Sequence, residues 1–363
     1  MLKTLLIVLP LIVFGLAAAL AAYIFYIGFS RPIIKPNHDD LRPFAPHDAA
    51  MRAGMDWYRA QNREQVEIVS RDGLRLRGEV LPGGDGKRVA ILMHGFRGDG
   101  CKDFAGVLRT WHELGFTLLI PCQRAHGRSE GRAICYGLRE RYDCADWAAW
   151  AQARFEPRDM YLVGVSMGAA TVMYTSALEL PSSVRGIVAD CGYTSPRAEF
   201  EHVLTCAGPI PRRLPLAIMR VMARMALGID INERVSDALE RTQLPILMIH
   251  GADDSFVPAR MSLENFSHCQ SHARMELFPG AAHGMSMNAD PERMRALIMD
   301  FTGSTGEYAP DIATESAVSL DANGARAQQS GDARAHSAAG KRAASSRRDS
   351  KNRRNAPREL AHS

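Results

Sequence analysis

A serine stands between two glycines where an apolar strand should turn into a helix. Gly164-Val165-Ser166-Met167-Gly168 follows the apolar run 160–163 and precedes the apolar run 169–173. In a strand–turn–helix of the form G-x-S-x-G, the turn is too tight for side chains beside the serine, so its Oγ is left accessible. Ser166 is therefore a candidate nucleophile. The plainer alternative is a Gly-Ser turn in an α/β protein, because isolated matches also occur by chance.

A serine hydroxyl attacks poorly at neutral pH unless a base takes its proton and an acid orients that base. Two later loops offer such groups. Asp253 and Asp254 follow an apolar strand predicted at 245–249, and His283 follows a strand predicted at 273–278. Because the carboxyl ends of parallel strands meet at one edge of a sheet, we expect the serine, one of these aspartates and the histidine to lie at one rim.

Other titratable residues compete for these roles. Asp190 ends a strand predicted at 186–190 and is a third candidate acid. His94, His126 and His250 each precede a glycine in a loop after a strand. We expect these three histidines to shape backbone turns rather than to transfer protons.

Hydrolysis by a serine also needs backbone N–H groups aimed at the developing oxyanion. The first predicted donor is the amide of Met167, the residue after the nucleophile. The second should come from the loop after a strand at 89–93, where Gly95 lets the chain turn back. The amide of Phe96 is the candidate there.

Several motifs, taken together, resemble the successive signatures of the α/β-hydrolase superfamily. They are His94-Gly95-Phe96, residues 124–131, Gly164 to Gly168, Cys191 to Ser195, His250 to Pro258 and Ala282-His283-Gly284. The chain is similar to bacterial membrane-anchored hydrolases related to serine aminopeptidases and acyl esterases. The resemblance covers about residues 63–302.

The resemblance implies an α/β fold: a mostly parallel eight-stranded sheet flanked by helices, with a small helical cap. It also selects Asp254 over Asp253, because Asp254 matches the acid of H-G-x-x-D-x-x-V-P loops. One departure is that Gln123 stands where aspartate is common, and Ala125 where the pattern has glycine. This departure bears on the local contacts of a loop that supports the site.

The remaining patterns complete one domain at 63–302. Residues 67–70 and 74–80 predict a hairpin with a two-residue turn at Asp72-Gly73. A further strand is predicted at 117–121, and helices at 102–114 and 139–155. Residues 197–243 are longer than a plain connection needs and predict a cap. The methionine-rich stretch of this cap is expected either to line an acyl pocket or to pack on the domain.

The first 30 residues predict a membrane anchor. Residues 5–29 carry no charge, and about 20 such residues cross a bilayer as a helix. A signal peptide cleaved after Ala19-Leu20-Ala21 is the alternative, but the apolar run continues well beyond a usual signal core. Residues 31–62 then form a membrane-proximal linker.

The side of the membrane that holds the domain is less strongly indicated. Positive charges flank the apolar segment on both sides, with Lys3 before it and Arg31, Lys35 and Arg42 after it. Since positive charge favours the cytoplasmic side, the two flanks indicate opposite orientations. The seven cysteines show no disulfide framework, which favours a reducing compartment. We therefore expect a single-pass protein of a bacterial inner membrane with a cytoplasmic domain, and a periplasmic domain is the alternative.

Residues 303–363 predict a disordered basic tail, because they lack the apolar side chains that a core requires. A solvated tail without a fixed partner is the plain interpretation, and contact with anionic lipid is the alternative. The tail supplies much of the net charge of +4, so no specific nucleic-acid partner is predicted.

The sequence holds no phosphate-binding loop and no Cys/His cluster at zinc spacing, so neither a metal nor a cofactor is predicted. The pattern predicts a serine hydrolase acting on a small acyl substrate, such as a carboxylic ester. A peptidase of the serine-aminopeptidase type and a non-catalytic scaffold with the same fold are the alternatives.

Overall fold

The computed structural model describes residues 2–32, 46–209, 211–269 and 272–303. Most of the predicted linker up to residue 45, and all of the predicted tail after Gly303, lie outside these ranges. The strands are β1 Glu64–Val69, β2 Arg75–Leu81, β3 Arg88–Met93, β4 Thr117–Pro121, β5 Asp159–Val165, β6 Val184–Asp190, β7 Ile246–Gly251 and β8 Ala273–Phe278. The helices are α1 Leu2–Phe29, α2 Asp48–Arg59, α3 Gly100–Asp103, α4 Leu108–Glu113, α5 Glu140–Phe155, α6 Met167–Thr175, α7 Pro196–Cys206, α8 Arg213–Leu227, α9 Ser236–Leu239, α10 Ala259–Ser267, α11 Ser286–Ala289 and α12 Pro291–Gly303.

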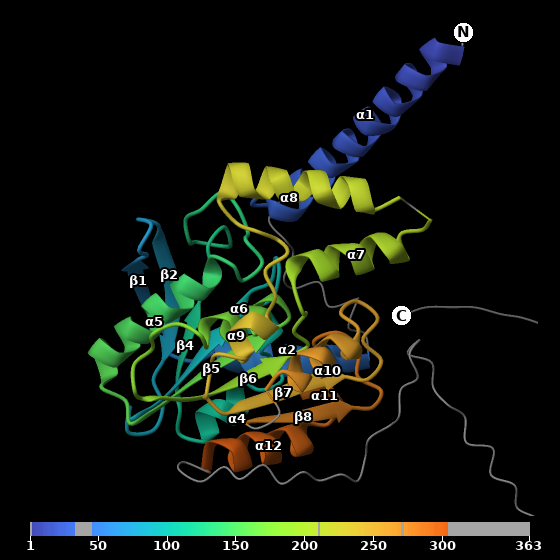
Figure 1. Cartoon of the computed structure of the whole chain (residues 1–363). Helices are drawn as coiled ribbons and strands as arrows, with labels where there is room; N and C mark the ends of the chain where they lie inside the picture. Colours follow the sequence, from blue (N-terminus) through green and yellow to red (C-terminus); the bar gives the residue numbers. More distant parts are fainter. Residues whose placement is uncertain (1, 33–45, 210, 270–271, 304–363) are drawn as a thin grey trace, which may run out of the picture. The chain divides into compact units, whose positions relative to one another are not determined.

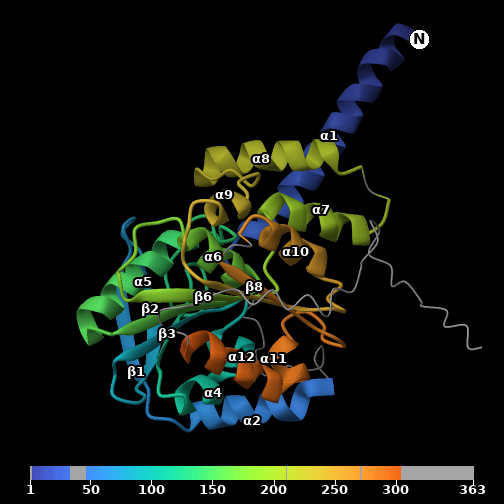
Figure 2. The ribbon, with the colours of Figure 1, turned by 60° about the horizontal axis from the view of Figure 1, so that its bottom comes forward.

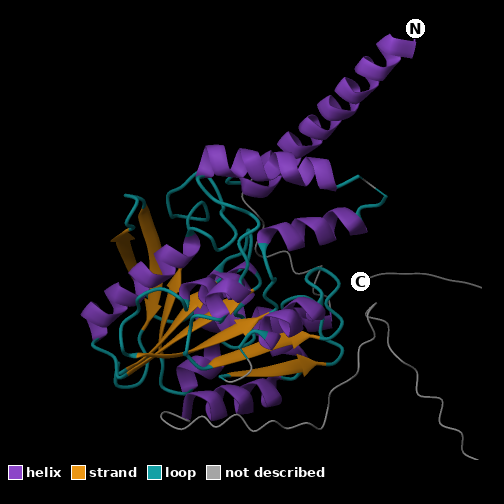
Figure 3. Cartoon of the chain, in the orientation of Figure 1, coloured by secondary structure: helices purple, strands orange, loops and turns teal. Residues whose placement is uncertain are grey.

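The strands form one eight-stranded sheet in the order β1-β2-β4-β3-β5-β6-β7-β8. Figure 3 shows the strands of this sheet in orange. β2 pairs antiparallel with β1 and β4, and the pairs from β4 to β8 are parallel. The predicted α/β fold, with a mostly parallel eight-stranded sheet, is thus confirmed. The central strands are buried along their whole length, which explains why they read as continuous apolar runs.

Helices cover both faces of the sheet (Figures 1 and 2). Side chains of α5 and α6 contribute to the hydrophobic core on one face, and those of α4 and α12 to the core on the other. Because both faces are covered, the loops after the parallel strands are left at the edges, where β5, β7 and β8 deliver the candidate residues.

The turn of the β1–β2 hairpin has three residues, one more than predicted. Ser70 and Leu74 pair through Ser70 N–H···O=C of Leu74 (2.9 Å), so the loop is Arg71-Asp72-Gly73. Gly73 has φ 85°, as the last position of a three-residue hairpin loop requires. The Ser70 hydroxyl closes this loop by donating to Asp72 Oδ1 and accepting from the Leu74 amide.

The single helix predicted at 102–114 is wrong, since the segment forms the short helices α3 and α4 with turns between them. Gly106 lies in this interruption, and a Cβ there would come within 2.6 Å of Asn288 Oδ1 on α11. The close approach of Asn288 to Gly106 is compatible with the interruption between α3 and α4. No local sequence pattern predicts a contact between residues so far apart in the chain.

The prediction that residues 31–62 form only a linker is also wrong for the described part. α2 packs its buried side chains Met51, Met55 and Tyr58 onto the domain. The Tyr58 hydroxyl donates to Glu79 Oε2 on β2 (2.8 Å), and a Cβ on Gly54 would lie 2.0 Å from the carbonyl oxygen of Ala105. The folded domain therefore begins before residue 63.

Helices α7, α8 and α9 lie between β6 and β7, where the sequence predicts a cap. α8 ends at Gly228, which adopts φ 64° as a left-handed C-cap. α8 also packs against α1 (Figures 1 and 2). The length and composition of α1 fit a membrane span or a signal sequence.

Arg124, in the loop after β4, ties this loop to α5 and to the β1–β2 turn. Its guanidinium donates to Asp143 over 2.6 Å and to Asp72 over 2.8 Å. The side chains of Arg124 and Asp143 are only 5% and 2% exposed. Burial raises the pKa of Asp143 to about 7 even though Arg124 stabilises its carboxylate. The ion pair is thus almost fully withdrawn from water.

We expect Arg124→Met to lower the free energy of unfolding by about 3 kcal/mol or more, because it leaves the carboxyl group of Asp143 buried without its cation. As a control, Arg75→Met removes an exposed pair with Glu130 and should leave stability nearly unchanged. Urea unfolding of the detergent-solubilised chain measures both. Equal effects would show that the buried pair does not brace the fold.

Candidate active site

Ser166 sits at a tight turn between β5 and α6. Its backbone has φ 57° and ψ −117°, a conformation that non-glycine residues rarely adopt. A Cβ on Gly164 would lie 2.2 Å from the Gly168 oxygen, and one on Gly168 would lie 1.8 Å from the Met93 oxygen. The two glycines of the motif are therefore required by close backbone contacts, as the sequence pattern predicts.

His283 lies in the loop between β8 and α11 and joins two of the candidate residues. Its Nε2 is 3.0 Å from Ser166 Oγ, and its Nδ1 is 2.7 Å from Asp254 Oδ2. With an ionised Asp254, the proton belongs on Nδ1, which leaves Nε2 free to accept from the serine hydroxyl. The ring also packs against Phe256, with 5.0 Å between the ring centres.

Asp254 is held in its ionised form by the loop after β7. Its Oδ1 accepts from the amides of Phe256 and Val257, each at 2.9 Å. Burial alone would raise the pKa of Asp254, but hydrogen bonding to His250 and His283 outweighs burial and holds this pKa below its usual range. The carboxylate can thus stay charged while it orients His283.

The two rival aspartates have other surroundings. The side chain of Asp253 is exposed to solvent. Asp190 is buried, its Oδ1 accepts from Ser286 (2.9 Å), and its Oδ2 has no partner among the described residues. Burial raises the pKa of Asp190 to about 6. Of the three candidate acids, Asp254 is the one that accepts from His283.

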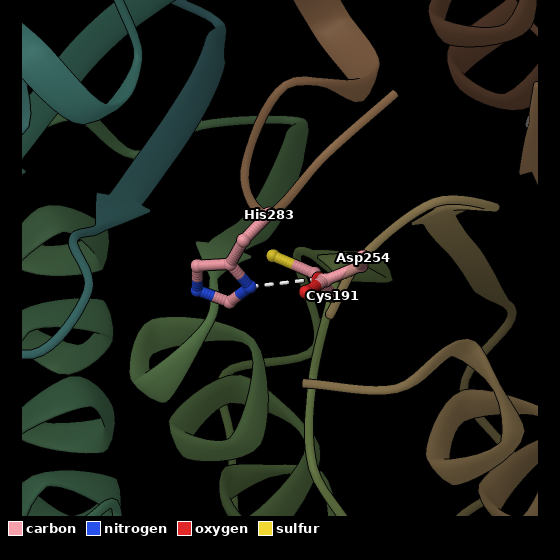
Figure 4. Close-up of side chains that lie close together, drawn as sticks. All are labelled: Cys191, Asp254 and His283. Atoms are coloured by element: carbon pink, nitrogen blue, oxygen red, sulfur yellow. Dashed lines mark hydrogen bonds and ion pairs between the residues drawn. The ribbon is translucent and has the colours of Figure 1, made fainter. Parts of the chain in front are cut away.

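Cys191 lies beside Asp254 and His283 (Figure 4), so these three side chains could in principle hold a metal ion. A metal needs a thiolate and free imidazole nitrogens. Burial raises the pKa of the Cys191 thiol well above its ordinary value, and both nitrogens of His283 are engaged by Asp254 and Ser166. The donor set fits an imidazole oriented for proton transfer better than a metal centre.

Phe96 and Met167 are the residues whose amides are predicted to bind the oxyanion. Both residues line the cavity that contains Ser166, and neither amide donates a hydrogen bond to any part of the chain that the structure describes. A Cβ on Gly95 would lie 3.4 Å from Ser166 Cβ, so the loop after β3 passes close to the serine. Both donors are thus available to a ligand.

The loop after β4, in which Gln123 and Ala125 depart from the family pattern, holds the loop after β3 in place. Gln123 donates its side-chain amide to the His94 carbonyl oxygen, and the Gln123 amide donates to His94 Nε2 (3.1 Å). His126 donates Nδ1–H to the Arg124 carbonyl and accepts from the Arg97 amide at Nε2 (3.0 Å). Burial lowers the pKa of His126 to about 3, so it acts as a neutral brace.

His250 has the same kind of role in the loop after β7. Its ring contacts the Ser262 hydroxyl (2.6 Å) and the Val257 carbonyl oxygen (2.7 Å). The prediction that His94, His126 and His250 shape backbone turns therefore agrees with the hydrogen bonds they form.

A largely apolar cavity of about 420 Å³ opens at Ser166. Side chains of α7 and, unexpectedly, of α1 form its walls, together with aromatic residues that include Phe96 and Tyr136. The sequence assigns α1 to membrane anchoring alone. Its contribution to the cavity arises because α1 docks onto the domain, which no local pattern shows.

Glu199 of α7 also lines the cavity, and the sequence does not predict this. It is 6% exposed, and neither carboxyl oxygen has a hydrogen-bond partner among the described residues. Burial, with a smaller contribution from the charge of Asp254, raises the pKa of Glu199 to about 8. A glutamate is common in the first turn of a helix because it interacts favourably with the helix dipole. The position of Glu199 in the sequence therefore does not indicate a role in the cavity.

Comparisons with known proteins agree with this architecture. Residues 90–215 match the sequence profile of the α/β-hydrolase fold. The uncharacterized protein YqkD of Bacillus subtilis is 22% identical over 248 residues, which cover 66% of this chain and 80% of YqkD. The uncharacterized protein Rv2307c of Mycobacterium tuberculosis is 27% identical over 237 residues, covering 64% of this chain and 75% of the relative.

Solved structures show the same fold at low sequence identity. The esterase Pf2001 of Pyrococcus furiosus aligns with a TM-score of 0.55 at 19% identity, over 67% of this chain and 90% of the esterase. Est1E of Butyrivibrio proteoclasticus, solved with ferulic acid bound, aligns with a TM-score of 0.52 at 19% identity, over 66% of this chain and 98% of Est1E. Since the profile match spans the strands and the turn that carry Ser166, and the solved structures align over 66–67% of the chain, the chain has the α/β-hydrolase fold.

Proposed function

We infer that the protein is a serine hydrolase that cleaves a carboxylic ester or a related acyl compound through an acyl-enzyme intermediate. The observation that carries this proposal is the hydrogen-bond chain from Asp254 through His283 to Ser166. A non-catalytic scaffold has no need for a buried carboxylate that keeps its charge, an oriented imidazole and a serine held in a rare backbone conformation.

The first half of the reaction follows from these contacts. His283 Nε2 takes the hydroxyl proton as Ser166 Oγ attacks the carbonyl carbon, and Asp254 stabilises the imidazolium that forms. The amides of Phe96 and Met167 donate to the oxyanion of the tetrahedral intermediate. As the intermediate collapses, the bond to the leaving alcohol breaks and His283 returns the proton to the alcohol oxygen.

The second half repeats these steps with water. His283 removes a proton from water, whose oxygen attacks the acyl carbon, and the bond to Ser166 Oγ breaks as the serine regains its proton. The free carboxylic acid then leaves, and the enzyme returns to its starting state. Pf2001 is an esterase, and this likeness is consistent with the proposal.

A serine aminopeptidase is the second candidate, and Glu199 is the observation that favours it. A carboxylate in the cavity could pair with the ammonium group of a peptide substrate. The surroundings point the other way, however, because burial keeps the proton on Glu199 at neutral pH. A neutral carboxyl group suits a hydrogen bond to an uncharged polar group of an ester.

A fluorophosphonate probe should label the full chain, and Ser166→Ala should abolish the labelling because the probe bonds to the activated Oγ. Ser183→Ala is the matched control, since that hydroxyl contacts Gln152 and should leave labelling intact. Gel fluorescence and intact mass measure both. An unlabelled but folded wild-type chain would refute the hydrolase proposal.

Asp254→Asn should reduce kcat for a nitrophenyl ester by about 10³–10⁴-fold, because an amide no longer holds His283 in the required tautomer. Asp253→Asn should remain close to wild type, since that side chain is exposed. Steady-state kinetics compare the two, with circular dichroism as the folding control. If Asp253→Asn were the more damaging change, Asp254 would lose its assigned role.

Nitrophenyl esters should be turned over much faster than aminoacyl anilides, and Glu199→Gln should retain ester hydrolysis because glutamine is also uncharged and can hydrogen-bond. Comparison of kcat/KM for the two substrate classes in wild type and variant tests this. Efficient anilide cleavage that Glu199→Gln removes would instead support the aminopeptidase.

A further inference from the structure

The N-terminal part of α1 needs an apolar environment that the domain does not provide. Its uncharged side chains are mostly exposed, including Leu6, Ile7, Leu9, Leu11, Ile12, Phe14 and Leu16. About 20 apolar residues cross the hydrocarbon core of a bilayer. A crossing that begins at the start of α1 therefore ends near Tyr23, and exposed tyrosines such as Tyr23 and Tyr26 favour the membrane–water interface.

The C-terminal part of α1, by contrast, is built into the domain. Phe29 is 1% exposed and packs against Tyr136 and Phe200, with ring centres 5.1 and 5.5 Å apart. The Tyr136 hydroxyl donates to the Gly28 carbonyl (2.9 Å), and Arg97 donates to the carbonyl of Ile27. α1 is thus a structural element of the folded domain, which favours an anchor over a cleaved signal peptide.

The docked part of α1 is also a wall of the cavity at Ser166. Leu20, Tyr23, Ile24 and Ile27 of α1 line the cavity together with side chains of α7, including Phe200, Val203 and Leu204. The residues that line the cavity therefore include the stretch of α1 at which we expect the helix to leave the bilayer. The volume of about 420 Å³ lies in the lower part of the usual range of ligand pockets and suits one acyl chain better than two.

Helix α8, which packs against α1, presents an apolar stripe of its own. Leu214, Val221 and Met225 are exposed, whereas Leu216, Met219 and Ala223 face the protein. α8 packs against α1, so two helices that contact each other both expose apolar side chains. The stripe is placed to rest on the lipid surface from which α1 emerges.

We propose that the cavity takes the acyl chain of a single-chain lipid ester, which reaches Ser166 from the bilayer along α1. This inference rests on the proposed ester hydrolysis and adds its substrate class. α1 is then both the anchor of the protein and a specificity-determining wall, because its side chains contact the substrate chain that enters from lipid.

The test compares two neighbouring residues of α1 with similar exposure. Ile27 (41% exposed) lines the cavity, whereas Tyr26 (54% exposed) is not among the lining residues. Tryptophan at Ile27 should fill part of the cavity and exclude a few methylenes of the chain. We expect Ile27→Trp to lower the ratio of kcat/KM for palmitoyl over butyryl nitrophenyl ester by about tenfold, and Tyr26→Trp to leave the ratio unchanged.

The full chain reconstituted in phosphatidylcholine vesicles should also release fatty acid from monooleoylglycerol in the same bilayer, and Leu20→Trp should slow this release. The outcomes separate the two proposals. Absence of fluorophosphonate labelling and of hydrolysis of either nitrophenyl ester would overturn the hydrolase assignment itself. Ester hydrolysis with the same chain-length ratio in Ile27→Trp and Tyr26→Trp, or no release from monooleoylglycerol, would overturn the lipid route alone.

Discussion

The backbone conformation at Ser166 is the constraint on which the site depends. A non-glycine residue with φ 57° costs free energy, and the surrounding structure must hold it there. The Ser166 amide donates to the Asp190 carbonyl on the neighbouring strand (2.9 Å), and Gly168 lets α6 approach the end of β3. These contacts place Oγ at the rim where the loops after β7 and β8 carry Asp254 and His283.

The hydrogen-bond partners of each acidic side chain near Ser166 determine whether it is ionised. Asp254 interacts with His250 and His283, which hold its pKa low, and accepts from two backbone amides, so it stays ionised although it is buried. Asp190 and Glu199 lack such a set of donors, and burial raises the pKa of each. One carboxylate can therefore orient the imidazole, while Glu199, whose pKa burial raises to about 8, adds little negative charge to a largely apolar cavity at neutral pH.

Prediction from the sequence succeeded where one local pattern decides the structure. Continuous apolar runs marked the buried parallel strands, and G-x-S-x-G marked the turn at Ser166. It failed where distant segments decide: the helix at 102–114 is interrupted where α11 approaches Gly106 closely, and α2 packs where a linker was expected. The hairpin loop gained a residue because the Ser70 hydroxyl closes a three-residue turn.

The sequence by itself indicated the buried parallel strands, the turn at Ser166 and the order of Ser166, Asp254 and His283 along the chain, because each depends on short-range spacing, strand periodicity or a local motif. The tertiary structure alone decided that Glu199 is buried in the cavity and that α1 is one of its walls. These features are contacts between residues far apart along the chain, so no local pattern encodes them.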